Sequence, residues 1–464
     1  MIGEKCMNPR SKERSAAVLL SMLLAGTAVV PLGAAAENIP PGAIGAVTAG
    51  SVTTFYYDTK VSGGMTAMWN DAVSTASATV ILYADWNAQN GTRLVSEGKG
   101  MASDGVICVP SGHEVTIDLN GFSIDRQLEL AIEDGEVIYV ENGATLNLTD
   151  TRASSGSAGK VTGGFSTNSA GGIEVAQGGT MNLWGGCITG NRTQDGGGGI
   201  RISGEDSKLT MTGGSIRENS AVLGGGGIAS TDAQVEIVEG ALTGNTTEGM
   251  GGGIFQSGGS VKLNSGSISS NSAKNGGGIF TQAAADLSVR GSFAVENNIA
   301  KSGGYLGAGG GIFAMSSLPV RLSGTPSITG NRHSDGTVSN LTFWVDTVTP
   351  FVGPRIVDEG VRSGAKVGLN FSCDEDAGIR ELGFAPSWTT NPFTADGEFE
   401  CLEADGVLYL KRPVQTSDYL PYILIGCGAV VLIAAGAIVW ILVKARKKNR
   451  RRKYSRKSPK TSAK

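Results

Sequence analysis

The sequence predicts an all-β fold, a right-handed parallel β-helix in which short strands stack into a solenoid. Three observations lead to this prediction: a glycine-rich repeat of about 26 residues, three short patterns within each period, and an asparagine at a fixed place in each period. Glycine makes up 71 of 464 residues, which indicates either disorder or a fold built of turns. The regular period favours a fold built of turns over disorder.

The three patterns recur together. Runs of glycine end at isoleucines that lie 25 to 28 residues apart, with a last interval of 33: Ile173, Ile200, Ile228, Ile254, Ile279 and Ile312. An apolar–polar–apolar pattern has as its middle residues Asn182, Thr210, Glu236, Lys262, Ser288 and Arg321. Asparagines follow an aliphatic residue by three positions: Asn191, Asn219, Asn245, Asn271, Asn298 and Asn331. Stacked about 4.8 Å apart, such strands hydrogen-bond in parallel to the turns on either side.

We expect the asparagines to form a ladder in one corner of the solenoid, each amide bonding to the next. Glycine supplies the positive φ that the corners need. Irregular turns extend the solenoid upstream, through Val115–Phe122 and Ala144–Leu148, and the long last interval predicts an inserted loop, Lys301–Ala308. We expect roughly eight turns, within residues 111–340.

Both ends of a solenoid need covers, because open strand edges promote aggregation. The N-terminal cap region is residues 37–110, where a helix is expected at Thr66–Ala76 and a strand at Thr79–Trp86. Residues that share one helical face are Met68, Trp69, Ala72, Val73 and Ala76. The C-terminal cap or stalk is residues 341–418, where the repeat is lost.

The first residues, 1–36, have the pattern of a signal peptide. A basic segment precedes an apolar stretch, Ala16–Val30, and small residues at 34–36 offer a cleavage site. A first membrane anchor is disfavoured, because the apolar stretch is short and ends at Pro31.

Residues 419–443 predict a single transmembrane helix. Leu420–Val443 contains no charged residue and is long enough to cross a bilayer. The tail, residues 444–464, holds twelve Lys or Arg and no acid, so we expect it in the cytoplasm, near anionic lipid. We therefore expect a single-pass cell-membrane protein with an extracellular body. Residues 37–443 carry a net charge of −18, which argues against nucleic acid as a partner.

Cysteine usage gives no framework of disulfides and no zinc site, and we expect neither a metal nor a cofactor. Cys373 and Cys401 flank one segment and could pair. Cys187 occupies the place of Ser215 and Ser267 in other periods, so we expect a small buried thiol there.

The Gly-Gly-Gly-Ile patterns, each followed by asparagine, resemble the polymorphic outer-membrane-protein repeats of bacterial surface proteins. Thr79–Leu82 and Asp118–Gly121 are similar to segments of pectate-lyase-like β-helix surface proteins. The resemblance covers roughly residues 65–370 and implies the fold and a surface location. Chlamydial members end in an outer-membrane barrel, whereas the expected helix here favours a cell with a single membrane. No Leu-Pro-x-Thr-Gly motif for attachment to the wall precedes that helix.

Many β-helix proteins are polysaccharide lyases or hydrolases, and the resemblance implies for these enzymes clustered acids with Arg, Lys or His on neighbouring turns. We find no such cluster in the sequence. His113 and His333 lie near opposite ends of the solenoid. Asp118, Asp125 and Glu129 are close in sequence, but Asp118 is expected on a strand, and pairs of acids are common on solvated rims. We therefore expect an adhesin-like binding module and not an enzyme, with a surface-tethered polysaccharide lyase or glycoside hydrolase as the alternative.

The candidate ligand-binding residues follow the repeated isoleucines. Their position reads Glu174, Arg201, Ala229, Phe255, Phe280 and Phe313. Unpaired charge is costly in an apolar core, so this position is expected to face outward. The three phenylalanines then form a surface stripe for glycan or protein, beside a Glu174–Arg201 pair. The alternative is that the phenylalanines turn inward or are covered by the inserted loop.

Overall fold

The computed structural model describes residues 39–57, 64–87, 106–152, 158–301, 309–344, 355–372, 380–384, 391–396, 400–404 and 407–411. They belong to the first of two units, residues 1–411; the second, residues 412–464, lies outside the described residues. The predicted signal peptide, membrane helix and basic tail also lie outside them. The described part is almost entirely β-structure and includes one helix, α2 (Gly64–Ala72).

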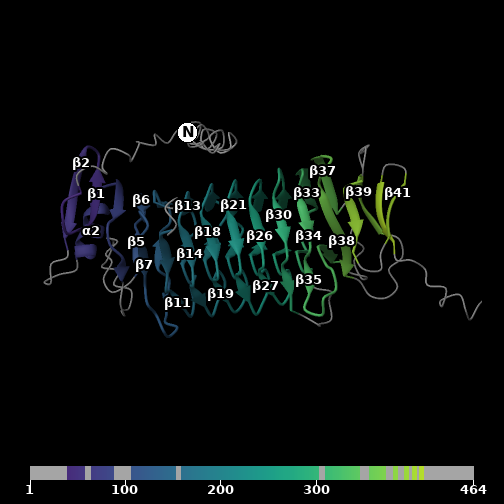
Figure 1. The fold of residues 1–464 in the computed structure, drawn as a ribbon, viewed down its shortest axis with the longest axis horizontal. Coiled ribbons are helices and arrows are strands. Elements are labelled where there is room, and N and C mark those ends of the chain that lie inside the picture. Colours follow the sequence, from purple (N-terminus) through teal and green to yellow (C-terminus); the bar gives the residue numbers. More distant parts are fainter. Residues whose placement is uncertain are drawn as a thin grey trace, which may run out of the picture. The chain divides into compact units, whose positions relative to one another are not determined.

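Strands of successive turns stand side by side in three sheets, as expected for a β-helix-like solenoid (Figure 1). The first sheet has 15 strands. Their order is β2 (Val52–Tyr57), β1 (Ala43–Ala49), β3 (Ser77–Leu82), β6 (Glu114–Asp118), β9 (Thr145–Thr149), β13 (Thr180–Leu183), β17 (Lys208–Met211), β21 (Gln234–Ile237), β25 (Ser260–Leu263), β29 (Asp286–Val289), β33 (Val320–Gly324), β37 (Ile356–Val361), β39 (Arg380–Phe384), β42 (Val407–Lys411) and β41 (Glu400–Ala404). Pairing is parallel from β3 to β39 and antiparallel at both ends.

The second sheet has 20 strands and contains two parallel columns, which meet at β38. The isoleucine column consists of β5 (Ile107–Val109), β8 (Ile138–Val140), β12 (Ile173–Val175), β16 (Ile200–Ser203), β20 (Ile228–Thr231), β24 (Ile254–Ser257), β28 (Ile279–Gln282), β32 (Ile312–Ala314) and β36 (Leu341–Trp344). The other column consists of β4 (Trp86–Asn87), β7 (Ser123–Asp125), β10 (Lys160–Thr162), β14 (Cys187–Thr189), β18 (Ser215–Arg217), β22 (Ala241–Thr243), β26 (Ser267–Ser269), β30 (Ala294–Glu296), β34 (Ser327–Thr329), β38 (Lys366–Ser372) and β40 (Phe393–Ala395).

A third sheet of seven very short strands was not predicted. It follows the asparagines and consists of β11 (Phe165–Ser166), β15 (Arg192–Thr193), β19 (Ser220–Ala221), β23 (Thr246–Thr247), β27 (Ser272–Ala273), β31 (Ile299–Ala300) and β35 (Arg332–His333). Two-residue strands have no apolar alternation to reveal them, so the sequence predicted three strands per turn where the structure has four.

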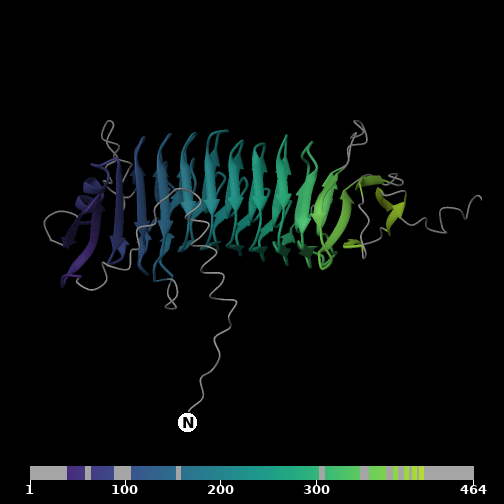
Figure 2. The same cartoon turned by 90° about the horizontal axis from the view of Figure 1, so that it is seen from above.

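Aliphatic side chains fill the interior of the solenoid. The repeated isoleucines pair in register, Ile173 with Ile200 and onward to Ile312, and each is fully buried. In the first sheet the apolar residues alternate inward and the polar residues outward, as in β17 and β21. The buried side chains of successive turns therefore form continuous stacks inside the solenoid. Figure 2 shows these turns from above.

The N-terminal cap is a β1–β2 hairpin with α2 packed beside it. The helix was predicted at Thr66–Ala76, but it begins at Gly64 and ends at Ala72. Met68, Trp69 and Ala72 are buried as expected, but Ala76 is exposed. Ser74 donates its hydroxyl hydrogen to the carbonyl oxygen of Asp71 at 2.7 Å, and such local bonds compete with helix continuation.

The predicted strand Thr79–Trp86 is two strands, β3 and β4, separated by a bend at residues 83–85. Parallel pairing includes β3 before residue 111 and β36–β38 after residue 340, so the stack extends beyond 111–340 at both ends. At the C-terminal end, β42 and β41 continue the first sheet in antiparallel fashion. No helix among the described residues is long and apolar enough to span a membrane.

Candidate binding surfaces

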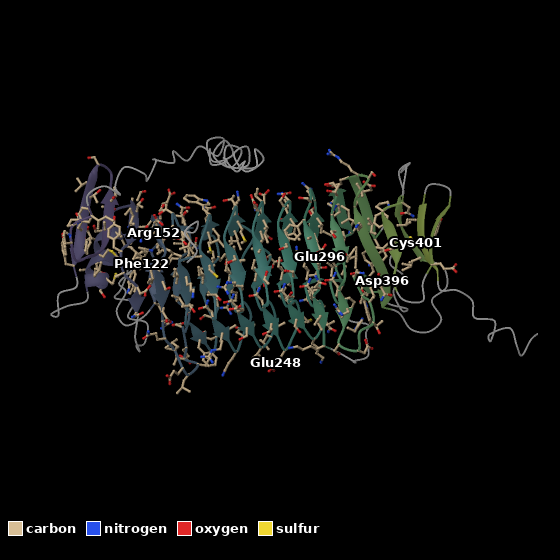
Figure 3. All side chains as sticks on the ribbon, in the orientation of Figure 1. Phe122, Arg152, Glu248, Glu296, Asp396 and Cys401 are labelled. Carbon is tan, nitrogen blue, oxygen red and sulfur yellow. The ribbon has the colours of Figure 1, made fainter. Side chains whose placement is uncertain are left out.

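The predicted asparagines form a continuous buried ladder. Each donates its side-chain amide, and also its backbone N–H, to Oδ1 of the next at 2.9–3.1 Å. The ladder continues from Asn331 to Asn340, and both N–H groups of Asn340 end on the carboxylate of Asp396, at 2.7 and 2.9 Å. Figure 3 labels Asp396 beside β38. The ladder lies buried at the corner where the column of β14 and β18 passes into the third sheet, so its role is structural.

The glycines before each isoleucine are required by this ladder. In the turn 224–227, Gly225 has a φ of +63°, which favours glycine. A Cβ on Gly227 would lie 2.6 Å from the carbonyl oxygen of Gly253 and 3.2 Å from Nδ2 of Asn245. The glycine and asparagine patterns are therefore two halves of one packing arrangement.

The structure brings all five predicted site residues into one column, which faces away from the aliphatic interior. We call it the outward column; it runs through Cys108, Tyr139, Glu174, Arg201, Ala229, Phe255, Phe280, Phe313 and Thr342. Its N-terminal half includes the charged residues Glu174 and Arg201, and its C-terminal half includes the three phenylalanines. The predicted ion pair is present, with Arg201 Nε 2.9 Å from Glu174 Oε1. Arg201 forms a second ion pair, in which its Nη1 lies 2.6 Å from Oδ2 of Asp195.

The phenylalanines stack on one another but are not an exposed stripe. The ring centroids of Phe255 and Phe280 lie 5.9 Å apart with near-parallel planes, and those of Phe280 and Phe313 lie 5.7 Å apart. Phe280 and Phe313 are each 1% exposed, and Phe255 is half-buried. A Cβ on Gly224 would lie 3.3 Å from the Phe255 ring, so the preceding glycine turn covers this part of the column. The expected exposure is therefore wrong for two of the three rings.

A buried polar cluster, which the sequence did not reveal, adjoins the charged half of the column. Glu136 accepts a hydrogen bond from the Ser169 hydroxyl, and Glu174 accepts one from the backbone N–H of Ala170 at 2.8 Å. Arg126 is fully buried and donates to the carbonyl oxygens of Asp134 and Glu136. Acids and arginines from neighbouring turns do therefore meet here.

Burial governs the ionisation of this cluster. It raises the pKa of Glu174 to about 7, although the Arg201 guanidinium opposes the shift. Burial likewise raises the pKa of Glu136 and lowers that of Arg126 to about 10. Glu136 is fully buried and Glu174 is 6% exposed, so a substrate does not reach either carboxyl in this conformation.

The outer side of the first sheet is the more accessible surface. We call it the polar face: the outward residues of β13, β17, β21, β25, β29 and β33, together with the residues that directly follow these strands. Lys208, Gln234 and Lys262 are exposed, and the other outward residues are half-buried except Ser288, which is buried. Its middle row, from Asn182 to Arg321, consists of the polar residues of the apolar–polar–apolar pattern.

Hydrogen bonds along the polar face hold its side chains in fixed positions. Asn182 donates to Oδ1 of Asn147 at 2.8 Å, and Asn264 donates to Oε1 of Glu236 at 3.1 Å. Toward the C-terminal end, Arg321 bridges Asp286 at 3.0 Å and Glu359 at 3.1 Å. These groups repeat once per strand, at a spacing of about 4.8 Å.

Cys187 pairs in register with Ser215 and is buried, as predicted, and its sulfur accepts a hydrogen bond from Arg217 Nε at 3.1 Å. Cys373 lies outside the described residues, and so do residues 302–308 of the predicted loop. Within the described ranges, no group of three His, Cys, Asp or Glu is placed to hold a metal ion.

A scan against protein-family models found no match for this chain, and searches of curated proteins and of solved structures found none.

Proposed function

We propose that this chain is a cell-surface interaction module that binds a glycan or a protein through a lateral face of its solenoid. The observation that carries the proposal is the polar face, where amide, hydroxyl and charged groups repeat in register over successive strands. Regular rows of hydrogen-bonding groups suit an extended polymer whose own polar groups repeat.

The chemistry of the polar face favours a glycan over a protein. Protein interfaces are centred on fully buried apolar and aromatic residues. On this face Trp184 and Val238 are the large apolar outward residues, and they stand two strands apart among polar neighbours. The outward column is a weaker candidate surface, because two of its three phenylalanine rings are covered.

Glycan and host-protein arrays probed with the purified full-length chain test this proposal. A triple variant of the polar face, Asn182→Ala, Thr210→Ala and Lys262→Ala, should lose binding by about tenfold or more. The matched control, Thr189→Ala, Thr243→Ala and Ser269→Ala, alters the outer side of the second sheet. Equal binding by both triple variants would exclude the polar face as the ligand site.

The finer assignments belong to the same proposal. We propose a right-handed coil, because crossovers between parallel strands are nearly always right-handed. We also propose export by residues 1–36, anchoring by residues 419–443, an extracellular body, and contact of the basic tail with anionic lipid. The apolar span and the twelve basic residues after it support this topology. Protease treatment of intact cells should remove the solenoid and leave the tail protected.

One observation favours the rival function, a surface-tethered polysaccharide lyase or glycoside hydrolase. Carboxyls with raised pKa values beside arginines are common at catalytic sites, and Glu136 and Glu174 fit that description. Their burial argues for a structural role instead. Enzymatic activity is tested by incubating the chain with anionic and neutral polysaccharides and assaying for new reducing ends and unsaturated products. The Glu174→Gln variant serves as the control.

A further inference from the structure

The N-terminal edge of the first sheet has the features of a pairing edge. β2 is the last strand of that sheet and, within the described ranges, pairs with β1 alone. Its outer side therefore presents a row of backbone N–H and C=O groups, which is a template for another strand. The pairing register of β2 with β1 is regular from Val52 to Tyr56.

The edge is held rigidly in place. The Phe55 ring stacks on that of Tyr83, with centroids 6.3 Å apart, and the Tyr56 hydroxyl donates to the Asp71 carboxylate of the cap helix. The first three residues of β2 are exposed, with Val52 64% exposed. A preformed edge of this kind loses little conformational freedom when it pairs.

The β2 strand itself lacks the residue types that usually protect an edge strand. Its sequence, Val-Thr-Thr-Phe-Tyr-Tyr, contains no charge, proline or glycine and has high β-propensity. The opposite edge of the same sheet, β41, carries Glu400 and Glu403. The two ends therefore differ, and β2 is the one suited to accept a strand.

We propose that β2 is a homophilic docking edge, which pairs antiparallel with β2 of a second copy and joins the two 15-stranded sheets across a two-fold axis. A second copy fits this edge because an uncharged strand can pair antiparallel with its own sequence without bringing like charges together. Residues 37–443 carry a net charge of −18, so two copies repel each other where their charged surfaces meet. Residues 39–57, which form the β1–β2 hairpin, contain no charged residue, so a second copy can approach this hairpin without meeting like charges on it.

The test is the mass of the full-length chain in a mild detergent, measured by light scattering after gel filtration over a range of concentrations. The wild type should form a dimer. Thr54→Lys places a charge on the exposed edge and should weaken dimerisation by about tenfold or more. Thr231→Lys, which adds the same charge at an exposed position of the inner strand β20, should dimerise as the wild type does.

Two further measurements keep the test independent of folding defects in one variant. Val52→Lys repeats the edge charge at another exposed position, and far-ultraviolet circular dichroism checks each variant. A peptide with the β2 sequence should compete with dimerisation of the unaltered chain, whereas a scrambled peptide should not. A wild type that is monomeric at every concentration, or a dimer indifferent to both the edge charges and the peptide, overturns the proposal.

Discussion

The side-chain amide of Asn245 donates to Oδ1 of Asn271 at 3.0 Å, and the backbone N–H of Asn245 donates to the same oxygen at 2.9 Å. One acceptor thus satisfies two donors in every turn of the ladder. Buried polar groups are stabilising only when they are paired, so the ladder makes each turn depend on its neighbours.

We therefore predict that Asn245→Ala destabilises the solenoid strongly. The substitution removes the acceptor of two donors on Asn219 and the donor to the Ile216 carbonyl, at about 1–3 kcal/mol for each buried group left unpaired. Thermal and urea unfolding measure the effect. Thr243→Ala, two residues away on the outward side, should change stability by less than about 0.5 kcal/mol; wild-type stability in Asn245→Ala would contradict the ladder.

A second prediction concerns the glycine turns. Gly227→Ala should destabilise the fold, because the new Cβ meets the Gly253 carbonyl oxygen and Nδ2 of Asn245. Overpacking of this kind typically costs about 1–3 kcal/mol. Gly336→Ala is the control: open space surrounds Gly336, so only its positive φ of +91° opposes substitution. The melting temperature should fall further for Gly227→Ala than for the control.

The phenylalanines supply a third prediction. Phe280 is buried between the Phe255 ring, which stacks on it, and the tilted Phe313 ring, so Phe280→Ala should cost about 3–5 kcal/mol. Phe255→Ala should cost less, because Phe255 is half-buried. Denaturant titration of both variants measures the difference. If a triple Phe→Ser variant kept its melting temperature and lost a ligand, the rings would be a docking surface after all.

The fourth prediction is a dependence of stability on pH. The pKa of Glu174 rises on folding from 4.5 to about 7, so the folded state binds this proton more tightly than the unfolded state. The free energy of unfolding should therefore fall as the pH rises from about 4.5 to about 7, by at most on the order of 3 kcal/mol. Glu174→Gln should flatten this slope, and Glu239→Gln, at an exposed site, should leave it unchanged. An unaltered slope in Glu174→Gln would assign the dependence to other groups.

The repeating contacts were predictable because each depends on one residue type at a fixed interval. Every glycine–isoleucine and asparagine position occupies the register that the sequence indicated, from Ile173 to Ile312 and from Asn191 to Asn331. The third sheet was missed because its strands are two residues long. Glu136 and Glu174 were not associated because they are 38 positions apart and meet only through the irregular turn at Ser169–Ala170. Alternation predicted that Phe280 faces away from the aliphatic interior. It did not predict that the Phe280 ring is nevertheless buried, because that depends on how a neighbouring turn packs over the ring.

The carboxylate of Asp396 has a consequence for how such a chain can change length. Every ladder asparagine donates its hydrogen bonds to the next asparagine toward the C-terminus. Whole turns can therefore be duplicated or deleted between Asn191 and Asn331 while each remaining asparagine still bonds to another asparagine. Asp396 accepts from Asn340 and, as a carboxylate, has no hydrogen to pass on. Growth by gene duplication is therefore confined to the inside of the array, and the terminating acid must be inherited with it.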